Sequence, residues 1–160
     1  MFDSRSCCVC SYRSSFILVN MIPYNLFLDD FRNPSDCLNY SHKYMPKDKS
    51  IYRQSWVTAR SHEDFIRIIK ATFDCGLFPE RVSFDHDLSE DHYSETFNNC
   101  PELYDTCQEK TGNHSAKWLV KFCIDNNIDL PKCYVHSMNP SGSERIWESL
   151  KDWQRHLNPI

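Results

Sequence analysis

The sequence predicts an α/β fold in which an open sheet of about four parallel strands is flanked by helices in three layers. Four short apolar runs alternate with segments of helical period, and polar or charged residues follow three of these runs. Apolar strands that alternate with helices of about ten or more residues favour parallel pairing through right-handed crossovers. The 160 residues are long enough for one domain that buries about 70% of its unfolded surface.

The first half of the chain contains two candidate strands. Residues 25–28 are apolar and stop at Asp29 and Asp30, as expected for a buried strand that meets a polar loop. Residues 33–54 carry two prolines and no clean period, which predicts mostly loop with a short helix. Residues 56–59 form the second candidate strand.

A helix is predicted after the second strand. Ser61 is a typical N-cap residue, and Asp64, three residues later, is a weak partner for a capping box. Gly76 supplies a stop signal. The apolar residues between these signals recur at helical spacing and share one face: Phe65, Ile68, Ile69 and Phe73.

The second half contains two more strands and two helices. Residues 81–84 form the third strand, and residues 89–113 are polar enough to predict a long loop of the kind that often covers a functional site. The next helix covers residues 115–126, and residues 133–135 form the fourth strand. The last helix follows Pro140, with its inward face formed by Ile146, Leu150, Trp153 and Leu157.

Composition and charge limit the possible function classes. Apolar residues make up 41% and charged residues 25% of the chain, which is ordinary for a globular protein and unlike a disordered one. The formal charge of -4 argues against a non-specific binder of duplex DNA. It leaves room for a small phosphorylated ligand or an RNA end held by a few local cations.

Cysteine usage and the N-terminal segment bear on the compartment. The nine cysteines are odd in number and scattered, which favours reduced thiols in a cytosolic protein. The apolar run at residues 16–22 is too short to span a bilayer, and no small-residue cleavage site follows it. We therefore expect a cytoplasmic protein with no membrane partner. Residues 1–20 are predicted to be a disordered extension, and residues 21–160 a single domain.

Ionisable residues at the strand ends are the strongest functional signal. Asp29 and Asp30 follow the first strand, residues 85–87 (Asp-His-Asp) the third, and residues 136–137 (His-Ser) the fourth. In an open parallel sheet, ligands bind outside the carboxyl ends of the strands, near the point where strand order reverses. We therefore expect these groups to meet in one crevice. Burying so many carboxylates is unfavourable unless a cation, protons or a cationic partner neutralises them.

Each cluster also has a purely structural interpretation. An Asp-Asp pair after a strand can simply cap a loop, and a histidine at a strand end often has only a structural role, in which its ring is hydrogen-bonded to neighbouring groups. Three adjacent polar residues at the third strand end are less easily explained in this way, because each must find a partner when buried. The occurrence of all three clusters in one fold favours a functional site.

Four segments carry these residues together with their flanks. They are residues 26–32 (LFLDDFR), 82–88 (VSFDHDL), 111–119 (TGNHSAKWL) and 135–142 (VHSMNPSG). In order and in flanking residues they resemble the cyclic-phosphate processing receiver-like domain, over about residues 24–157. The resemblance implies a receiver-like, flavodoxin-like fold. It also implies a role in processing cyclic phosphates at RNA ends or on nucleotides, in bacteria or their phages.

The resemblance to a signalling receiver is partial. Asp29 and Asp30 match the acidic pair that holds Mg²⁺ in receivers, Asp85 matches the phospho-acceptor, and Ser137 matches the hydroxyl after the fourth strand. A receiver would next need a fifth strand ending in lysine, but only one amphipathic helix follows Pro140. The resemblance therefore implies that the added histidines have replaced phosphorelay signalling with acid–base chemistry.

The resulting hypothesis is a metal-assisted phosphoesterase that acts on cyclic phosphates. Asp29, Asp30 and Asp85 are the candidate ligands of Mg²⁺ or Mn²⁺, which prefer carboxylates and water. His86 and His136 are the candidate acid and base, because imidazole titrates near neutral pH. The expected ligand is a nucleotide or an RNA-end phosphate.

The remaining candidates would position the catalytic groups or the substrate. Asp87 would orient one of the imidazoles as a hydrogen-bond acceptor, and Arg32 would clamp the phosphate in a bidentate fork. Thr111 precedes a helix N-terminus, where free N–H groups favour an anion, although it also suits a plain N-cap. Further substrate contacts are expected from the last motif: Ser137, Asn139 and Gly142.

Two other functions stay open. A non-enzymatic domain that sequesters a cyclic nucleotide, or an interaction module with a vestigial site, would keep the crevice and tolerate the loss of His86 or His136. A true receiver would instead accept phosphate on Asp85.

Overall fold

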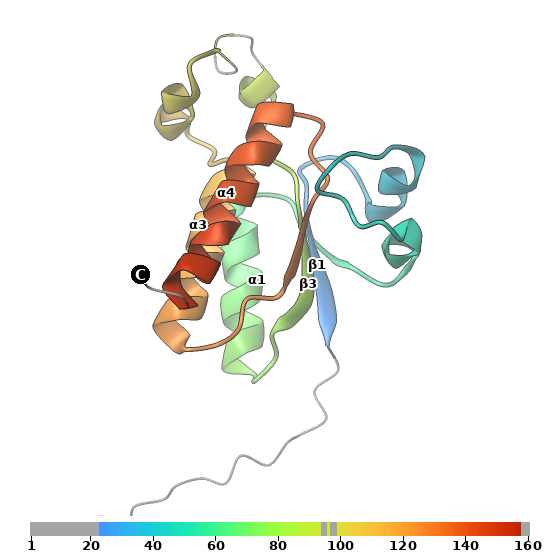
Figure 1. Cartoon of the computed structure of the whole chain (residues 1–160), viewed down its shortest axis with the longest axis vertical. Helices are drawn as coiled ribbons and strands as arrows, with labels where there is room; N and C mark the ends of the chain where they lie inside the picture. Colours follow the sequence, from blue (N-terminus) through green and yellow to red (C-terminus); the bar gives the residue numbers. More distant parts are fainter. Residues whose placement is uncertain (1–22, 94–95, 97–98, 158–160) are drawn as a thin grey trace, which may run out of the picture.

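The structure is a computed structural model, and it describes residues 23–93, 96 and 99–157. The chain forms an open sheet with helices packed against it (Figure 1). The predicted extension at residues 1–20 lies outside the described residues. None of the described helices combines the length and the apolar character that a membrane span requires.

Four parallel strands form the sheet. They are β1 (Tyr24–Leu28), β2 (Val57–Ala59), β3 (Pro79–Phe84) and β4 (Lys132–Val135), in the spatial order β2-β1-β3-β4. Every neighbouring pair is parallel. The predicted receiver-like α/β fold is therefore confirmed, with each strand close to its predicted position.

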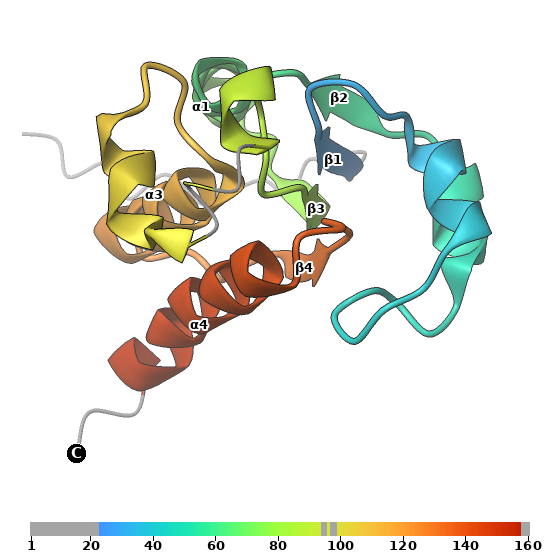
Figure 2. The same cartoon turned by 90° about the horizontal axis from the view of Figure 1, so that it is seen from above.

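Three helices cover one face of the sheet (Figure 2). They are α1 (His62–Asp74), α3 (Gly112–Asn126) and α4 (Pro140–Leu157). Their apolar faces pack against inward-facing strand residues such as Leu26 and Leu28, and together these side chains form the main core. The amphipathic period that predicted the helices is thus explained by burial against this face. Leu157 is an exception, because it was predicted to face inward but is 56% exposed at the end of α4.

Local signals set the helix ends. The Ser61 hydroxyl accepts the backbone N–H of Asp64 at 3.1 Å, so α1 begins after its predicted N-cap. Gly76 follows α1 with φ 78°, a conformation that residues with a side chain rarely adopt. The next helix, α3, begins at Gly112 rather than at the predicted Ser115.

The opposite face is covered by the connection between β1 and β2. This connection holds two 3₁₀ helices, η1 (Pro34–Asn39) and η2 (Lys49–Arg53), where the sequence predicted mostly loop. Short 3₁₀ turns carry no 3.6-residue period, so the apolar pattern could not reveal them. A second, smaller core forms here from Phe27, Cys37, Met45 and Tyr52.

Alternation along β1 lets one strand serve both cores. Leu26 and Leu28 face the helices, whereas Phe27 faces the 3₁₀ helices. Burial on both faces is typical of parallel sheets, and it makes such a strand read as a continuous apolar run.

The same connection also reaches the outer edge of β4. The backbone N–H of Val135 donates to the carbonyl of Tyr44 at 3.1 Å. The hydroxyl of Tyr40 donates to the carbonyl of His136 at 2.9 Å. These bonds hold residues 40–44 beside the carboxyl end of β4, although the two segments are far apart in the sequence.

The segment predicted as a long loop, residues 89–113, contains short helices. They include η3 (Glu90–Tyr93) and η4 (Pro101–Thr106). His92 in η3 is fully buried, and its Nε2 lies 3.0 Å from the carbonyl oxygen of Glu109 at the other end of the segment. The backbone N–H of His62, at the start of α1, donates to Oε1 of Glu109 at 3.1 Å, which anchors the segment to the helical face.

Candidate functional site

The strand register places three functional side chains in one row. The last residues of β1, β3 and β4 are paired across the sheet. The residues that follow them, Asp29, Asp85 and His136, therefore lie side by side at its carboxyl edge. Because β1 and β3 are neighbours without being consecutive strands, this edge is also the point where strand order reverses. Ligands of open α/β sheets bind at such a point.

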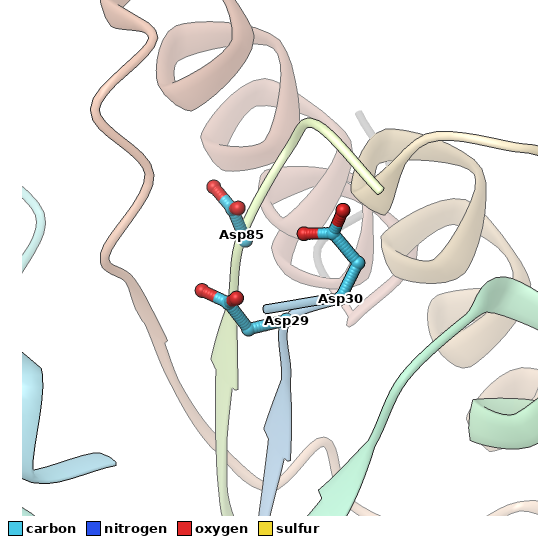
Figure 3. A group of neighbouring side chains, drawn as sticks. All are labelled: Asp29, Asp30 and Asp85. Carbon is cyan, nitrogen blue, oxygen red and sulfur yellow. The ribbon is translucent and has the colours of Figure 1, made fainter. Parts of the chain in front are cut away.

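The predicted acidic ligands meet at this edge (Figure 3). One carboxylate oxygen from each of Asp29, Asp30 and Asp85 lies within 4.8 Å of the other two. Asp29 and Asp85 are buried, and Asp30 is half-buried. The three side chains thus offer hard oxygen ligands, the type that suits Mg²⁺ or Mn²⁺.

Arg32 supplies positive charge to this acid cluster. Its Nε donates to Asp29 and its Nη2 pairs with Asp85, both at 2.8 Å. Its Nη1 donates to the Tyr40 hydroxyl at 2.9 Å. The guanidinium is therefore bonded to three protein groups. The predicted clamp on a phosphate stays a prediction, and the second N–H group on each of Nη1 and Nη2 is not used in these three bonds.

Several donors hold Asp29 as an anion. Its Oδ1 accepts the backbone N–H of Phe31 at 2.9 Å and also that of Arg32. Its Oδ2 lies 3.1 Å from Nε2 of His136. Burial acts to raise the pKa of Asp29, but the hydrogen bond from His136 and the charges of His136 and Arg32 outweigh it and lower the pKa to about 2.

Asp30 lies in the opposite electrostatic situation. Burial, followed by the charges of Asp29 and Asp85, raises the pKa of Asp30 to about 6. Its Oδ1 is buried and has no hydrogen-bond donor among the residues that the structure describes. A divalent cation would satisfy such an acceptor oxygen beside two other carboxylates. The residues present therefore fit a hard cation.

His136 supports the acid cluster from the 3₁₀ side of the sheet. Its fully buried ring stacks on Phe27 with centroids 4.2 Å apart. Its Nδ1 lies 2.7 Å from the hydroxyl of Ser83, which is itself 2.9 Å from the hydroxyl of Tyr52. Because Nε2 bonds to Asp29, both ring nitrogens have protein partners.

His86 is enclosed on the helical side of the sheet. Its Nδ1 lies 2.7 Å from Oδ1 of Asp87, whereas its Nε2 is buried and has no hydrogen-bond partner among the described residues. A Cβ at Gly142 would lie 2.3 Å from Cγ of His86, so only glycine permits this approach of α4. The ring of Tyr104 meets the imidazole edge-on, with centroids 4.9 Å apart.

A pocket of about 230 Å³, which we name the acid pocket, opens at the acid cluster. Its lining residues are Asp29, Phe31, Arg32, Asp85, Asp87, Ser137 and Met138. Ser137 is thus placed as the sequence predicted. Asp87 lines the acid pocket with His86 behind it, whereas we expected Asp87 to support a histidine that lines the pocket. None of the described residues of the 89–113 segment lines it.

The expectation that both histidines share one crevice is corrected by this geometry. Side chains of a strand alternate between its two faces. His86 comes two residues after Phe84, and His136 comes one residue after Val135, while Phe84 and Val135 both face the helices. The two imidazoles therefore lie on opposite faces, and neither lines the acid pocket. Their acid and base roles stay predictions.

Three other predicted substrate contacts serve the local fold. Asn139 donates from Nδ2 to Asp87 at 3.1 Å, and its Oδ1 accepts the backbone N–H of Gly142 at 2.9 Å. Thr111 is buried at the start of α3, where its backbone N–H donates to Nδ1 of His114 at 3.1 Å. Neither Asn139, Gly142 nor Thr111 lines the acid pocket, and their substrate contacts stay predictions.

Sequence reasoning missed the hydroxyl groups that support the row of strand-end residues. Ser83 carried a usable signal, since a polar residue inside a buried strand needs a partner. Tyr40 and Tyr52 lie in the segment without a period, and nothing in the sequence connects them with His136 or Arg32.

Comparison with known proteins agrees with this arrangement. Residues 24–152 match the model of a family described as Cyclic-phosphate processing Receiver domain. No curated protein and no solved structure shows a significant match to the chain. The matched span contains all four strands and every residue that lines the acid pocket.

Proposed function

The chain belongs to the cyclic-phosphate processing receiver domain family, and from this premise we propose that it is a metal-assisted phosphoesterase acting on cyclic phosphates. The candidate substrates are RNA ends with a 2′,3′-cyclic phosphate and cyclic nucleotides. The observation that carries the proposal is the gathering of Asp29, Asp30 and Asp85 at the point where strand order reverses.

The acid cluster would hold the cation. Support comes from the buried Oδ1 of Asp30, which lacks a donor among the described residues, and from its two carboxylate neighbours. When bound, Mg²⁺ or Mn²⁺ would neutralise the acids and polarise a phosphoryl oxygen. Because the pKa of Asp30 is raised to about 6 in the cation-free protein, this candidate ligand is mostly ionised only above that pH.

Asp87 is the carboxylate in the acid pocket that stands outside the proposed cation site. His86 and Asn139 orient it through hydrogen bonds of 2.7 and 3.1 Å. In the proposed reaction Asp87 accepts a proton from water as the water oxygen bonds to phosphorus. One P–O bond of the cyclic phosphate breaks, and the released hydroxyl oxygen takes up the proton. His86 then acts as a positioning residue for Asp87.

Two further groups would position the phosphate. Ser137 lies in the acid pocket, where its hydroxyl can donate to a phosphate oxygen. Arg32 lines the same pocket, and a second N–H group on Nη1 or Nη2 can donate to a phosphate oxygen.

A product assay on the purified full chain tests the proposal. The probes are a 2′,3′-cyclic nucleotide, RNA with a 2′,3′-cyclic phosphate end, and a cyclic dinucleotide, each with and without EDTA. We expect turnover of at least one probe, lost in EDTA and in Asp85→Asn. It should persist in Asp74→Asn, which changes an exposed carboxylate at the end of α1. Turnover that survives both EDTA and Asp85→Asn contradicts the cation role.

The burial of both imidazoles favours a second candidate, a domain that binds a cyclic phosphate without cleaving it. Neither ring lines the acid pocket, so a binder would need no change in the geometry. Saturable binding of a probe without any product would support this candidate and exclude the phosphoesterase.

A further inference from the structure

A cavity adjoins the acid pocket beside the carboxyl end of β4. It has a volume of about 290 Å³ and is lined by residues 40–44, by the first turns of α4, and by Ser137 and Met138. Ser137 and Met138 also line the acid pocket. The cavity and the acid pocket are therefore adjacent.

The chemistry of this cavity suits a nucleoside. Its volume is close to the lower end of the range for small-molecule sites, about 300–1,000 Å³. Tyr40 and Tyr44 are among the residues that line it. His42 also lines it, and Nε2 of His42 is buried without a hydrogen-bond partner among the described residues. Nucleobases are recognised by aromatic contacts together with hydrogen bonds to their edges.

A larger groove continues from the cavity along the outer edge of β4. Its volume is about 660 Å³, and it shares Lys43 and Tyr44 with the cavity. We name it the basic groove, because its charged lining residues are four cations and one carboxylate: Lys43, Lys47, Arg81, Lys132 and Asp48. Three aromatic residues, Tyr44, Tyr134 and Trp147, also line it.

Two of the four cations carry charge that no neighbouring carboxylate neutralises. Lys43 and Arg81 each have a carboxylate neighbour, at 3.8 and 2.6 Å respectively. Lys47 and Lys132 are exposed, and neither forms an ion pair with any residue that the structure describes. In a chain with a formal charge of -4, this local excess of cations favours a polyanionic ligand at the basic groove.

We propose that the cavity and the basic groove bind a single-stranded RNA chain whose terminal cyclic phosphate lies in the acid pocket. The last nucleoside occupies the cavity, and the preceding phosphates lie along the basic groove. The placement of the terminal phosphate rests on the proposed function, whereas the groove stands on its own charge and shape. A cyclic mononucleotide would fill the acid pocket and the cavity and leave Lys47 and Lys132 without a ligand.

Direct binding tests the groove without requiring turnover. The probes are a 5′-labelled single-stranded RNA of about eight nucleotides with a 2′,3′-cyclic phosphate end, and the corresponding 2′,3′-cyclic mononucleotide. By fluorescence anisotropy and competition, we expect the RNA to bind at least about tenfold more tightly than the mononucleotide. The double variant Lys47→Glu with Lys132→Glu should remove this advantage and reduce the salt dependence of RNA binding.

The matched control is Lys70→Glu, which reverses an exposed charge on α1 at the helical face. It should leave the affinity for RNA unchanged, and the affinity for the mononucleotide should be unchanged in every variant, which also shows that each variant is folded. Absence of RNA binding overturns the proposal, as does equal affinity for RNA and mononucleotide or an equal loss in Lys70→Glu. Groove-dependent RNA binding without any product would instead retain this proposal and reject the phosphoesterase.

Discussion

The two histidines at the strand ends are equally buried but differ in their hydrogen bonds. His136 has partners at both ring nitrogens and stacks on Phe27, whereas His86 has a partner at Nδ1 only, within the part of the chain that the structure describes. Leaving a buried nitrogen unpaired is unfavourable, so selection for stability alone does not explain His86. The comparison indicates that the His136 side of the sheet supports the acid cluster, while the His86 side leaves one buried polar atom unpaired among the described residues.

The largest loss of stability is expected from adding a side-chain atom on the His86 side of the sheet, where the packing leaves no space for it. A Cβ at Gly112 would lie 1.7 Å from the carbonyl oxygen of Asp85, which is backbone and has little room to move. We expect Gly112→Ala to reduce the free energy of unfolding by about 3 kcal/mol or more, measured by urea denaturation. A reduction below about 1 kcal/mol would show that this side of the sheet is loosely packed.

The next effect compares the two histidines directly. Asparagine keeps a polar atom near Nδ1 and removes Nε2, so His136→Asn loses the bond to Asp29 and the stacking on Phe27. We expect it to reduce the free energy of unfolding by about 2–3 kcal/mol. His86→Asn removes a nitrogen that carries no bond, so its effect should be at least about 1 kcal/mol smaller. If urea denaturation gave the same loss of unfolding free energy for both variants, the proposed difference between the two histidines would be wrong.

A smaller effect appears in the pH dependence of stability. The pKa of Asp29 is about 2 in the folded state, below the ordinary 3.8, so its stabilising contribution is present above about pH 4 and lost toward pH 2. The pKa of Asp30 is raised to about 6, so the folded state binds that proton more tightly and stability decreases as the pH rises from about 4 to 6. In denaturation at a series of pH values, Asp30→Asn should remove this decrease and keep the loss at acid pH. A decrease that persists in Asp30→Asn would assign it to another group.

The smallest effect is the stabilisation by Mg²⁺. At about ten times its Kd, a ligand that binds only the folded state stabilises it by about 1.4 kcal/mol. Because Asp30 is protonated below about pH 6, Mg²⁺ should raise the Tm more at pH 7 than at pH 5. The shift should disappear in Asp30→Asn and persist in His86→Asn, which leaves the acid cluster intact. A shift of equal size in all three proteins would place the cation elsewhere.

The convergence of the acids could be predicted from the sequence because it follows from a general property of parallel sheets. Apolar runs located the strands, and the residues after Leu28 and Phe84 had to meet at one edge once those strands became neighbours. The side of the sheet that each histidine occupies was also predictable in principle. His86 comes two residues after the end of its strand and His136 comes one residue after the end of its strand. Because side chains alternate between the two faces, this difference places the two imidazoles on opposite faces.

The supporting groups could not be predicted in this way. Tyr40 and Tyr52 belong to the 3₁₀ segment, whose contacts with the sheet depend on tertiary packing rather than on a local period. The pairing of Arg32 with both Asp29 and Asp85 depends on the same packing. Sequence pattern therefore located the charged groups but not the bonds that orient them.

The bond from the Tyr40 hydroxyl to the carbonyl of His136 has a consequence for the order of folding. The two residues are 96 positions apart, so this contact closes a very long stretch of chain. Contacts of such separation form late, because the entropy of loop closure must be overcome before they are made. During synthesis, β4 leaves the ribosome last of the four strands. Until then, the nascent chain contains Asp29, Asp30 and Asp85 but cannot yet hold residues 40–44 beside the carboxyl end of β4.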